Sequence, residues 1–136
     1  MNQAISEGRL ELRVRYAEVD AMGVLHHSRY FVYFEMGRTE LLRASGIAYA
    51  DMERMGLFYV VTRLECRYRA PARYDDLLAL ITRATRVSLV RVDHEYQLLR
   101  GETLLAEASS TLALVDRSGR PTPLPDDLYE RLARRR

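Results

Sequence analysis

The residues whose types could do chemistry lie close together, between Tyr16 and His27. Asp20 is a lone carboxylate, Gly23 offers the backbone freedom that a turn needs, and the adjacent histidines His26 and His27 follow. A carboxylate can attack an electrophilic carbon or take a proton from water, while the unpaired N–H groups of a helix start can hold an oxyanion. We therefore predict that Asp20 lies on a loop that faces the start of a helix.

The next stretch predicts that helix. Residues 28–45 contain no proline, and apolar or small residues recur there at helical spacing: Tyr30, Phe31, Phe34, Gly37, Leu41 and Leu42. We predict a helix with this stripe buried, with Ser28 or His27 as its N-cap and with Gly46 at its end.

Two features of the helix call for partners. Arg38 falls within the apolar stripe by helical angle, and a buried guanidinium needs a counter-charge, for which Glu35 is the nearest candidate. Three apolar residues instead fall among polar neighbours on the opposite side, and they indicate a further contact there, with a second subunit as one option: Val32, Tyr33 and Met36.

The rest of the chain predicts a sheet. Alternating apolar and polar residues, separated by turn signals, indicate strands over residues 10–16, 59–68, 77–86, 89–99 and 104–115. A short helical turn follows the long helix, and Asp126 or Asp127 can cap a short final helix. Because the strands are apolar on one face only, we predict an α+β fold in which an antiparallel sheet wraps over the long helix. No linker is visible, so residues 1–136 are predicted to form a single domain.

Composition excludes several classes of protein. The net charge of +2 and the lack of an aromatic-basic motif argue against nucleic-acid binding, and without lysine there is no Schiff-base or P-loop chemistry. No run is apolar enough for a membrane span, and the first residues do not resemble a signal peptide. The single cysteine, Cys66, is predicted to fill the core and fits a cytoplasmic protein. A metal site from Asp20, His26 and His27 is disfavoured because neighbouring side chains diverge, and we predict no metal or cofactor.

Taken together, the motifs resemble a known family. The order of strand, Asp loop, long helix and four strands is similar to the hotdog fold. The spacing of residues around Asp20 resembles the 4-hydroxybenzoyl-CoA thioesterase-like acyl-CoA thioesterases, in particular the small bacterial members found beside Tol-Pal genes. The matching positions are Tyr16, Asp20, Gly23, Val24, His27, Tyr30, Tyr33, Phe34, Glu35, Arg38 and Leu42, then residues 69–72 with Asp75 and Asp76, and residues 119–125.

The resemblance implies hydrolysis of an acyl-coenzyme A thioester. Asp20 matches the catalytic carboxylate, as nucleophile or general base, and Tyr16 matches the tyrosine four residues before it. The backbone N–H of His27 is implied to polarise the thioester carbonyl. His26 departs from the family, in which an aromatic residue is frequent. Two alternatives that need no chemistry stay open: Asp20 as a turn residue and Tyr16 as an aromatic residue of the core.

We also predict partners for the chain. A single sheet leaves its edges open, so a homodimer or homotetramer is expected, and the resemblance places the active site between subunits. Arg86 and Arg91 flank the turn at Ser88 and are predicted, with Arg120, to bind the coenzyme A phosphates. The acyl group and the thiol carrier, coenzyme A or acyl carrier protein, stay open. The alternative function is a noncatalytic acyl-thioester-binding or scaffold protein of the same fold.

Overall fold

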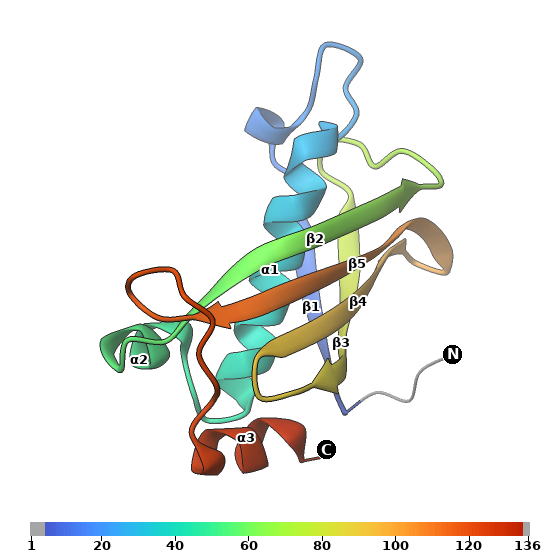
Figure 1. Ribbon diagram of the computed structural model, residues 1–136. Coiled ribbons are helices and arrows are strands. Elements are labelled where there is room, and N and C mark those ends of the chain that lie inside the picture. Colours follow the sequence, from blue (N-terminus) through green and yellow to red (C-terminus); the bar gives the residue numbers. More distant parts are fainter. Residues whose placement is uncertain (1–4, 135–136) are drawn as a thin grey trace.

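The computed structural model describes residues 5–134 and consists of one sheet, one long helix and several short helices (Figure 1). In chain order, the elements are β1 (Ser6–Arg13), the short 3-10 helix η1 (Tyr16–Glu18), α1 (His27–Ala44), α2 (Tyr49–Arg54), β2 (Phe58–Tyr68), β3 (Leu77–Val87), β4 (Arg91–Arg100), β5 (Thr103–Val115) and α3 (Asp126–Ala133). The four later strands agree with their predicted ranges to within two residues.

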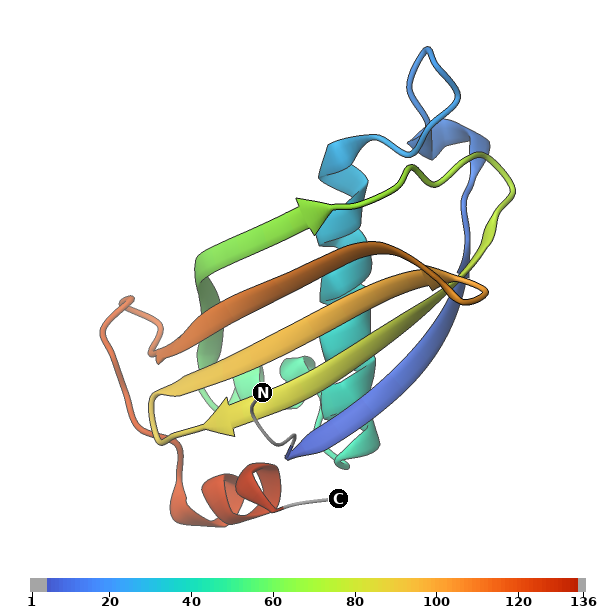
Figure 2. The same cartoon turned by 90° about the vertical axis from the view of Figure 1, so that its right-hand side faces the viewer.

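The five strands form one antiparallel sheet in the order β1-β3-β4-β5-β2. The sheet curves over α1, which crosses its concave face, while α2 and α3 lie toward the C-terminal end of α1 (Figures 1 and 2). The predicted α+β arrangement, a one-sided sheet around a long helix, is confirmed. The order leaves β1 and β2 as the two edge strands.

The core lies between α1 and the inner face of the sheet. Phe34 is fully buried and its ring stacks on that of Tyr96 in β4, with the ring centroids 4.7 Å apart. Gly37 permits the closest approach of α1 to the sheet, since a β-carbon there would lie 2.2 Å from Oγ1 of Thr82. The buried stripe predicted for the long helix is thus confirmed, and a glycine lets the helix touch β3.

Two boundaries differ from the prediction. The first strand runs from Ser6 to Arg13 instead of over residues 10–16, because its pairing with β3 begins at Ser6 and the chain then turns into η1. The N-cap of α1 is His26, one residue earlier than predicted, because Nδ1 of its imidazole accepts a hydrogen bond from the backbone N–H of Ser28.

One prediction about α1 is wrong, and another is met within the chain itself. Within residues 5–134, no ion pair joins Glu35 to Arg38: Glu35 is exposed and Arg38 half-buried, because both line an open groove of about 390 Å³ beside α1. The contact predicted for the polar side exists at Tyr33, but it is made by the same chain. The Tyr33 ring is buried by the chain's own loop before α1, and only Val32 and Met36 stay exposed.

Cys66 and His94 have structural positions. Cys66 is half-buried and packs against the main core, as predicted, and burial raises the pKa of its thiol. His94 is buried in β4. No helix within residues 5–134 combines the length and apolar character that crossing a bilayer requires.

Candidate active site

The loop that carries Asp20 is a tight, well-anchored turn. Val19 and Leu25 form a bridge across its base, and Val24 forms another with Arg73. The N–H of Leu25 also donates to the carbonyl of Ala72 at 2.8 Å. Figures 1 and 2 show this loop projecting beyond the N-terminal end of α1. The predicted position of Asp20, on a loop at the helix start, is confirmed.

Asp20 uses one carboxylate oxygen to hold the turn. Its Oδ1 accepts hydrogen bonds from the N–H of Met22 at 2.8 Å and that of Val24 at 3.4 Å. Gly23, with φ of +79°, supplies the left-handed residue of the turn. No donor within residues 5–134 contacts Oδ2 of this exposed side chain. The turn function of Asp20 is therefore real, yet it leaves one oxygen open for chemistry.

The start of α1 leaves one N–H group unpaired. The carbonyl of His26 accepts from the N–H of Arg29 at 2.9 Å, and its imidazole Nδ1 accepts from Ser28 at 3.2 Å. Among the described residues, no acceptor contacts the N–H of His27. This donor lies at the positive end of the helix dipole, where it can stabilise a developing oxyanion.

A hollow of about 270 Å³ opens beside His27. It is lined by Leu25, His27, Tyr30, Tyr68, Arg69, Ala70 and Pro71. The hydroxyl of Tyr68 donates to the carbonyl of His27 at 3.1 Å, and its ring meets Tyr30 edge-on. Burial raises the pKa of Tyr68 to about 12, so its hydroxyl stays protonated at neutral pH. The hollow thus combines largely apolar walls with the protonated hydroxyl of Tyr68.

Tyr16 lies in η1 and is 77 % exposed. Its ring meets Tyr74 edge-on, with the centroids 5.4 Å apart. The alternative in which Tyr16 belongs to the core is wrong, because the chain leaves the sheet at Arg13 and turns before this residue is reached. An orienting function of the Tyr16 hydroxyl stays a prediction.

Glu18 is a buried carboxylate next to this loop that the sequence analysis missed. It is only 2 % exposed, and its Oε1 accepts hydrogen bonds from the Tyr33 hydroxyl and the Arg15 N–H, both at 2.8 Å. The one signal in the sequence was Tyr33, an aromatic residue on the polar side of the helix that required some partner.

The arginines predicted to bind phosphate lie far from Asp20 within one chain. Arg91 forms a two-bond ion pair with Asp93, with both N–O distances 3.0 Å, and Arg86 is paired in register with the same aspartate. Arg120 lies in the turn after β5, where its N–H donates to Asp116. The turn between β3 and β4 and the Asp20 loop are at opposite ends of the molecule (Figure 1). One chain therefore does not bring these groups together.

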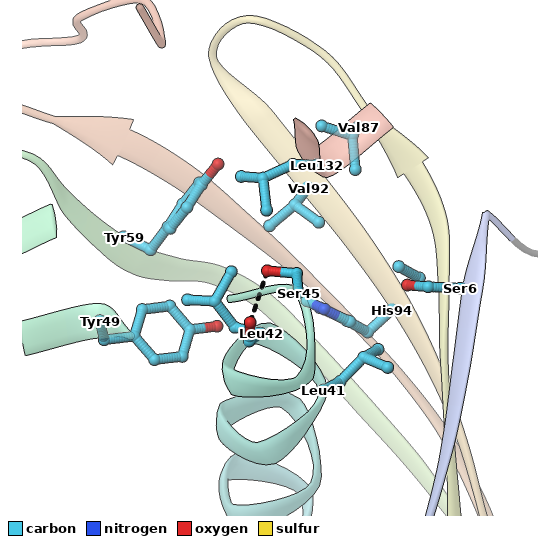
Figure 3. Close-up of a pocket in the computed structure, with 11 residues that line it drawn as sticks. Ser6, Leu41, Leu42, Ser45, Tyr49, Tyr59, Val87, Val92, His94 and Leu132 are labelled. Carbon is cyan, nitrogen blue, oxygen red and sulfur yellow. Dashed lines mark hydrogen bonds between the residues drawn. The ribbon is translucent and has the colours of Figure 1, made fainter. Parts of the chain in front are cut away.

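A small cavity of about 40 Å³ lies at the C-terminal end of α1 (Figure 3). Tyr49, Tyr59, His94 and apolar side chains from α1, β3, β4 and α3 line it. Within residues 5–134, the buried Nδ1 of His94 and the hydroxyl of Tyr59 have no hydrogen-bond partner. Burial, with a smaller contribution from the Arg38 charge, lowers the pKa of His94 to about 3, so this imidazole is neutral at pH 7.

Comparisons with known proteins agree with this arrangement. Residues 14–132 match the thioesterase-like superfamily. The acyl-CoA thioesterase YbgC of Haemophilus influenzae is 36 % identical over 106 residues, which cover 77 % of this chain and 78 % of that protein. A putative esterase of Aquifex aeolicus is 33 % identical over 118 residues, covering 87 % and 91 %.

Solved structures are similar as well. A probable thioesterase from Bartonella henselae superposes with a TM-score of 0.83 at 35 % identity, covering 88 % of this chain and all of that one. The DHNA-CoA thioesterase of Staphylococcus aureus gives 0.88 at 28 % identity, covering 92 % and 87 %. The fold and these relatives define a hotdog-fold thioester hydrolase. The chain belongs to the thioesterase-like superfamily.

Proposed function

We propose that this protein hydrolyses acyl-coenzyme A thioesters, with Asp20 as the reacting carboxylate and the His27 N–H as the oxyanion donor. One observation carries the proposal: His27, whose N–H is unpaired at the start of α1, lines a largely apolar hollow, and the loop before it holds a carboxylate with one oxygen open. The thioesterases among the relatives support the same reaction.

The reaction follows from these groups. The thioester carbonyl oxygen accepts a hydrogen bond from His27, which increases the positive charge on the carbonyl carbon. Oδ2 of Asp20 then either attacks that carbon, forming a mixed anhydride and releasing the coenzyme A thiolate, or takes a proton from a water molecule that attacks instead. In the first route, water hydrolyses the anhydride and restores Asp20. Both routes give the free acid and the thiol.

In our proposal, a second copy of the chain completes the site that binds the acyl-coenzyme A substrate. β2 is a free edge strand of 11 residues, and several of its apolar side chains are exposed: Val60, Val61, Leu64 and Tyr68. An exposed apolar edge of this length favours pairing with another strand, and two-fold symmetry makes the pair antiparallel.

Such pairing explains how distant groups could share one site. Val60 of β2 is in register with Ala113 of β5, and Ala113 with Arg91 of β4. Tyr68, at the other end of β2, contacts the start of α1 through His27. An antiparallel pair places the Val60 end of one strand beside the Tyr68 end of the other. Arg86 and Arg91 of one copy and the start of α1 of the other would then lie at the same end of the paired β2 strands.

The interface has a direct test. A charge in the centre of β2, Leu64→Glu, is expected to yield monomers with little activity. Leu89→Glu, at a similarly exposed leucine in the turn after β3, should leave the assembly intact. Light scattering at micromolar concentration distinguishes them, and also separates dimers from tetramers. A fully active wild-type monomer would contradict the shared site. A cytoplasmic location stays a prediction that rests on the single cysteine.

The activity is tested with a substrate panel. Short and long aliphatic, benzoyl and naphthoyl coenzyme A thioesters, together with one acyl carrier protein thioester, are incubated with the purified protein while free thiol is measured. We expect steady turnover of at least one coenzyme A substrate. Saturable binding without any thiol release would favour the noncatalytic acyl-thioester-binding protein. Faster turnover of the carrier-protein thioester would indicate that acyl carrier protein, instead of coenzyme A, carries the acyl group.

A further inference from the structure

Glu18 lies between the sheet and the reactive loop, at the end of η1 and two residues before Asp20. It is a charged side chain that is 2 % exposed, and the other members of its cluster are Arg15 and Tyr33. Nothing in the proposed reaction uses this carboxylate directly. A buried charge of this kind costs free energy unless its hydrogen bonds are satisfied, so the groups that bind the Glu18 carboxylate must be identified.

Both carboxylate oxygens of Glu18 are satisfied. Oε1 accepts hydrogen bonds from the Tyr33 hydroxyl and the Arg15 N–H, and Oε2 accepts from the Arg15 guanidinium at 3.2 Å. Burial acts to raise the pKa of Glu18, but these hydrogen bonds outweigh it, and the pKa is below its usual value. Burial, and then the bond to Glu18, raise the pKa of Tyr33. The pair is therefore a carboxylate that accepts and a phenol that donates throughout the neutral range.

The cluster connects both ends of the loop to α1. The backbone carbonyl of Glu18 accepts from the N–H of His26 at 2.9 Å, and this bond closes the loop on the residue that caps the helix. The side chain of Glu18 binds Tyr33, six residues after His27, which is about 9 Å along the axis at 1.5 Å per residue. Two separate bonds from one residue thus fix the loop against the first two turns of the helix.

We propose that Glu18 is the positioning residue for Asp20: through Tyr33 and His26, it holds the reactive loop at a fixed distance from the His27 N–H. This inference rests on the proposed function, because it assigns a purpose to the distance between the carboxylate and the oxyanion donor. Misplacement of a reacting group by about 1 Å can reduce a rate about a hundredfold, so a rigid anchor at this point affects turnover.

The alternative is a purely structural contact, and the kinetics distinguish the two. Loss of a structural contact lowers the thermal midpoint but leaves kcat per folded molecule unchanged. Loss of a positioning contact lowers kcat with little change in KM, because neither Glu18 nor Tyr33 lines the hollow at the start of α1. The two partners should also depend on each other, since either change breaks the same bond.

The experiment compares Glu18→Gln, Tyr33→Phe and the double variant with the wild type, at a temperature where all are folded by circular dichroism. We expect kcat to fall by about tenfold or more in each single variant and KM to change by less than about twofold. The kcat of the double variant should be no lower than that of the less active single variant. Glu40→Gln is the matched control, because Glu40 also pairs with an arginine but is exposed on α1. It should retain wild-type kcat.

The outcomes separate this inference from the proposed function. If Asp20→Asn is inactive while folded Glu18→Gln and Tyr33→Phe keep wild-type kcat, the cluster is only structural and the inference is overturned. If Asp20→Asn is fully active, the proposed role of Asp20 as the reacting carboxylate fails whatever the other variants do, and thiol release from the substrate panel tests the hydrolysis itself. If Glu18→Gln does not fold, Tyr33→Phe decides alone, since it leaves both bonds from Arg15 to the carboxylate in place.

Discussion

The hydroxyl of Tyr33 donates a hydrogen bond to Oε1 of Glu18 at 2.8 Å, and this bond connects the reactive loop to the long helix. Both side chains are almost fully buried, at 2 % exposure each. The loop projects beyond the N-terminal end of α1 (Figure 1), and this bond adds to its backbone anchors a side-chain contact from inside the helix.

From the bond between Glu18 and Tyr33 we predict how the stability of the fold depends on pH. The folded pKa of Glu18 lies below its ordinary value of 4.5, so its ionised form stabilises the fold above pH 4.5, and this stabilisation is lost as pH falls through the folded pKa. The groups that face it are Arg15, Tyr33 and, toward Tyr33, Arg29. We expect the difference in thermal midpoint between wild type and Glu18→Gln to be constant from pH 7 to about 5 and to shrink below. A difference that grows on acidification contradicts the assignment.

His94 predicts a second acid effect over a different range of pH. Its folded pKa is about 3, whereas an unfolded histidine has 6.5, so only the unfolded chain binds this proton between those values. The free energy of unfolding should therefore decrease by about 1.4 kcal/mol per pH unit below pH 6.5. The nearby charges are Arg38 on α1 and Asp93 on β4. His94→Leu should remove this slope and His27→Gln, at an exposed residue, should keep it; equal slopes in denaturant unfolding of both variants would contradict the prediction.

Gly37 predicts a steric effect. A β-carbon there would meet Oγ1 of Thr82 at 2.2 Å and Cδ2 of Leu80 at 2.7 Å, so α1 would have to move away from β3. Gly37→Ala should lower the free energy of unfolding by about 1–3 kcal/mol. Adding Thr82→Ala should recover part of this loss, because it removes the nearest atom. Gly8→Ala, whose new carbon meets only the end of a leucine at 3.3 Å, is the control in chemical denaturation.

The arginines of the turn between β3 and β4 are predicted to affect binding rather than turnover. Arg91 is already paired with Asp93, so Arg86 is the freer of the two to contact a phosphate. Arg86→Ala should raise KM for the coenzyme A thioester about tenfold with kcat nearly unchanged, and Arg91→Ala should raise it less. Arg9→Ala, on the exposed face of β1, is the control. The phosphate assignment fails if both substitutions leave KM at its wild-type value.

The sequence predicted the elements and the reactive loop because both depend on local signals. The spacing of Tyr30, Phe34 and Gly37 indicates a buried helical stripe, and Asp20 with Gly23 indicates a turn whatever lies around it. The first strand was misplaced for a non-local reason, since Ser6 belongs to it only through its pairing with Ala84 of β3.

Neither the environment of Glu18 nor that of Arg38 could be predicted in this way. A helical wheel assumes that the sheet buries one side of the helix, but the chain before α1 folds back over another side and buries Tyr33 and Glu18 there. Arg38 lies where the stripe borders an open groove, so water can solvate its guanidinium and no partner is required. Both cases depend on how distant segments meet.

The open groove beside α1 also predicts the effect of Glu35→Gln. Because Glu35 is exposed and has no ion pair with Arg38 within the described chain, we expect its loss to change the free energy of unfolding by less than about 0.5 kcal/mol, and kcat to stay at the wild-type value. The larger loss of stability that a buried ion pair would cause is not expected. Thermal unfolding and steady-state kinetics of this variant provide the comparison for the substitution below.

The most direct test of the account is kcat of Asp20→Asn. The amide keeps an oxygen that can accept the bonds from Met22 and Val24, so the turn and the fold should survive, whereas the nucleophile and the base are both lost. We predict that kcat falls by about a hundredfold or more, with the thermal midpoint close to that of the wild type. A folded Asp20→Asn with wild-type kcat, or a stable but inactive Glu35→Gln, would show that the reacting carboxylate is not Asp20.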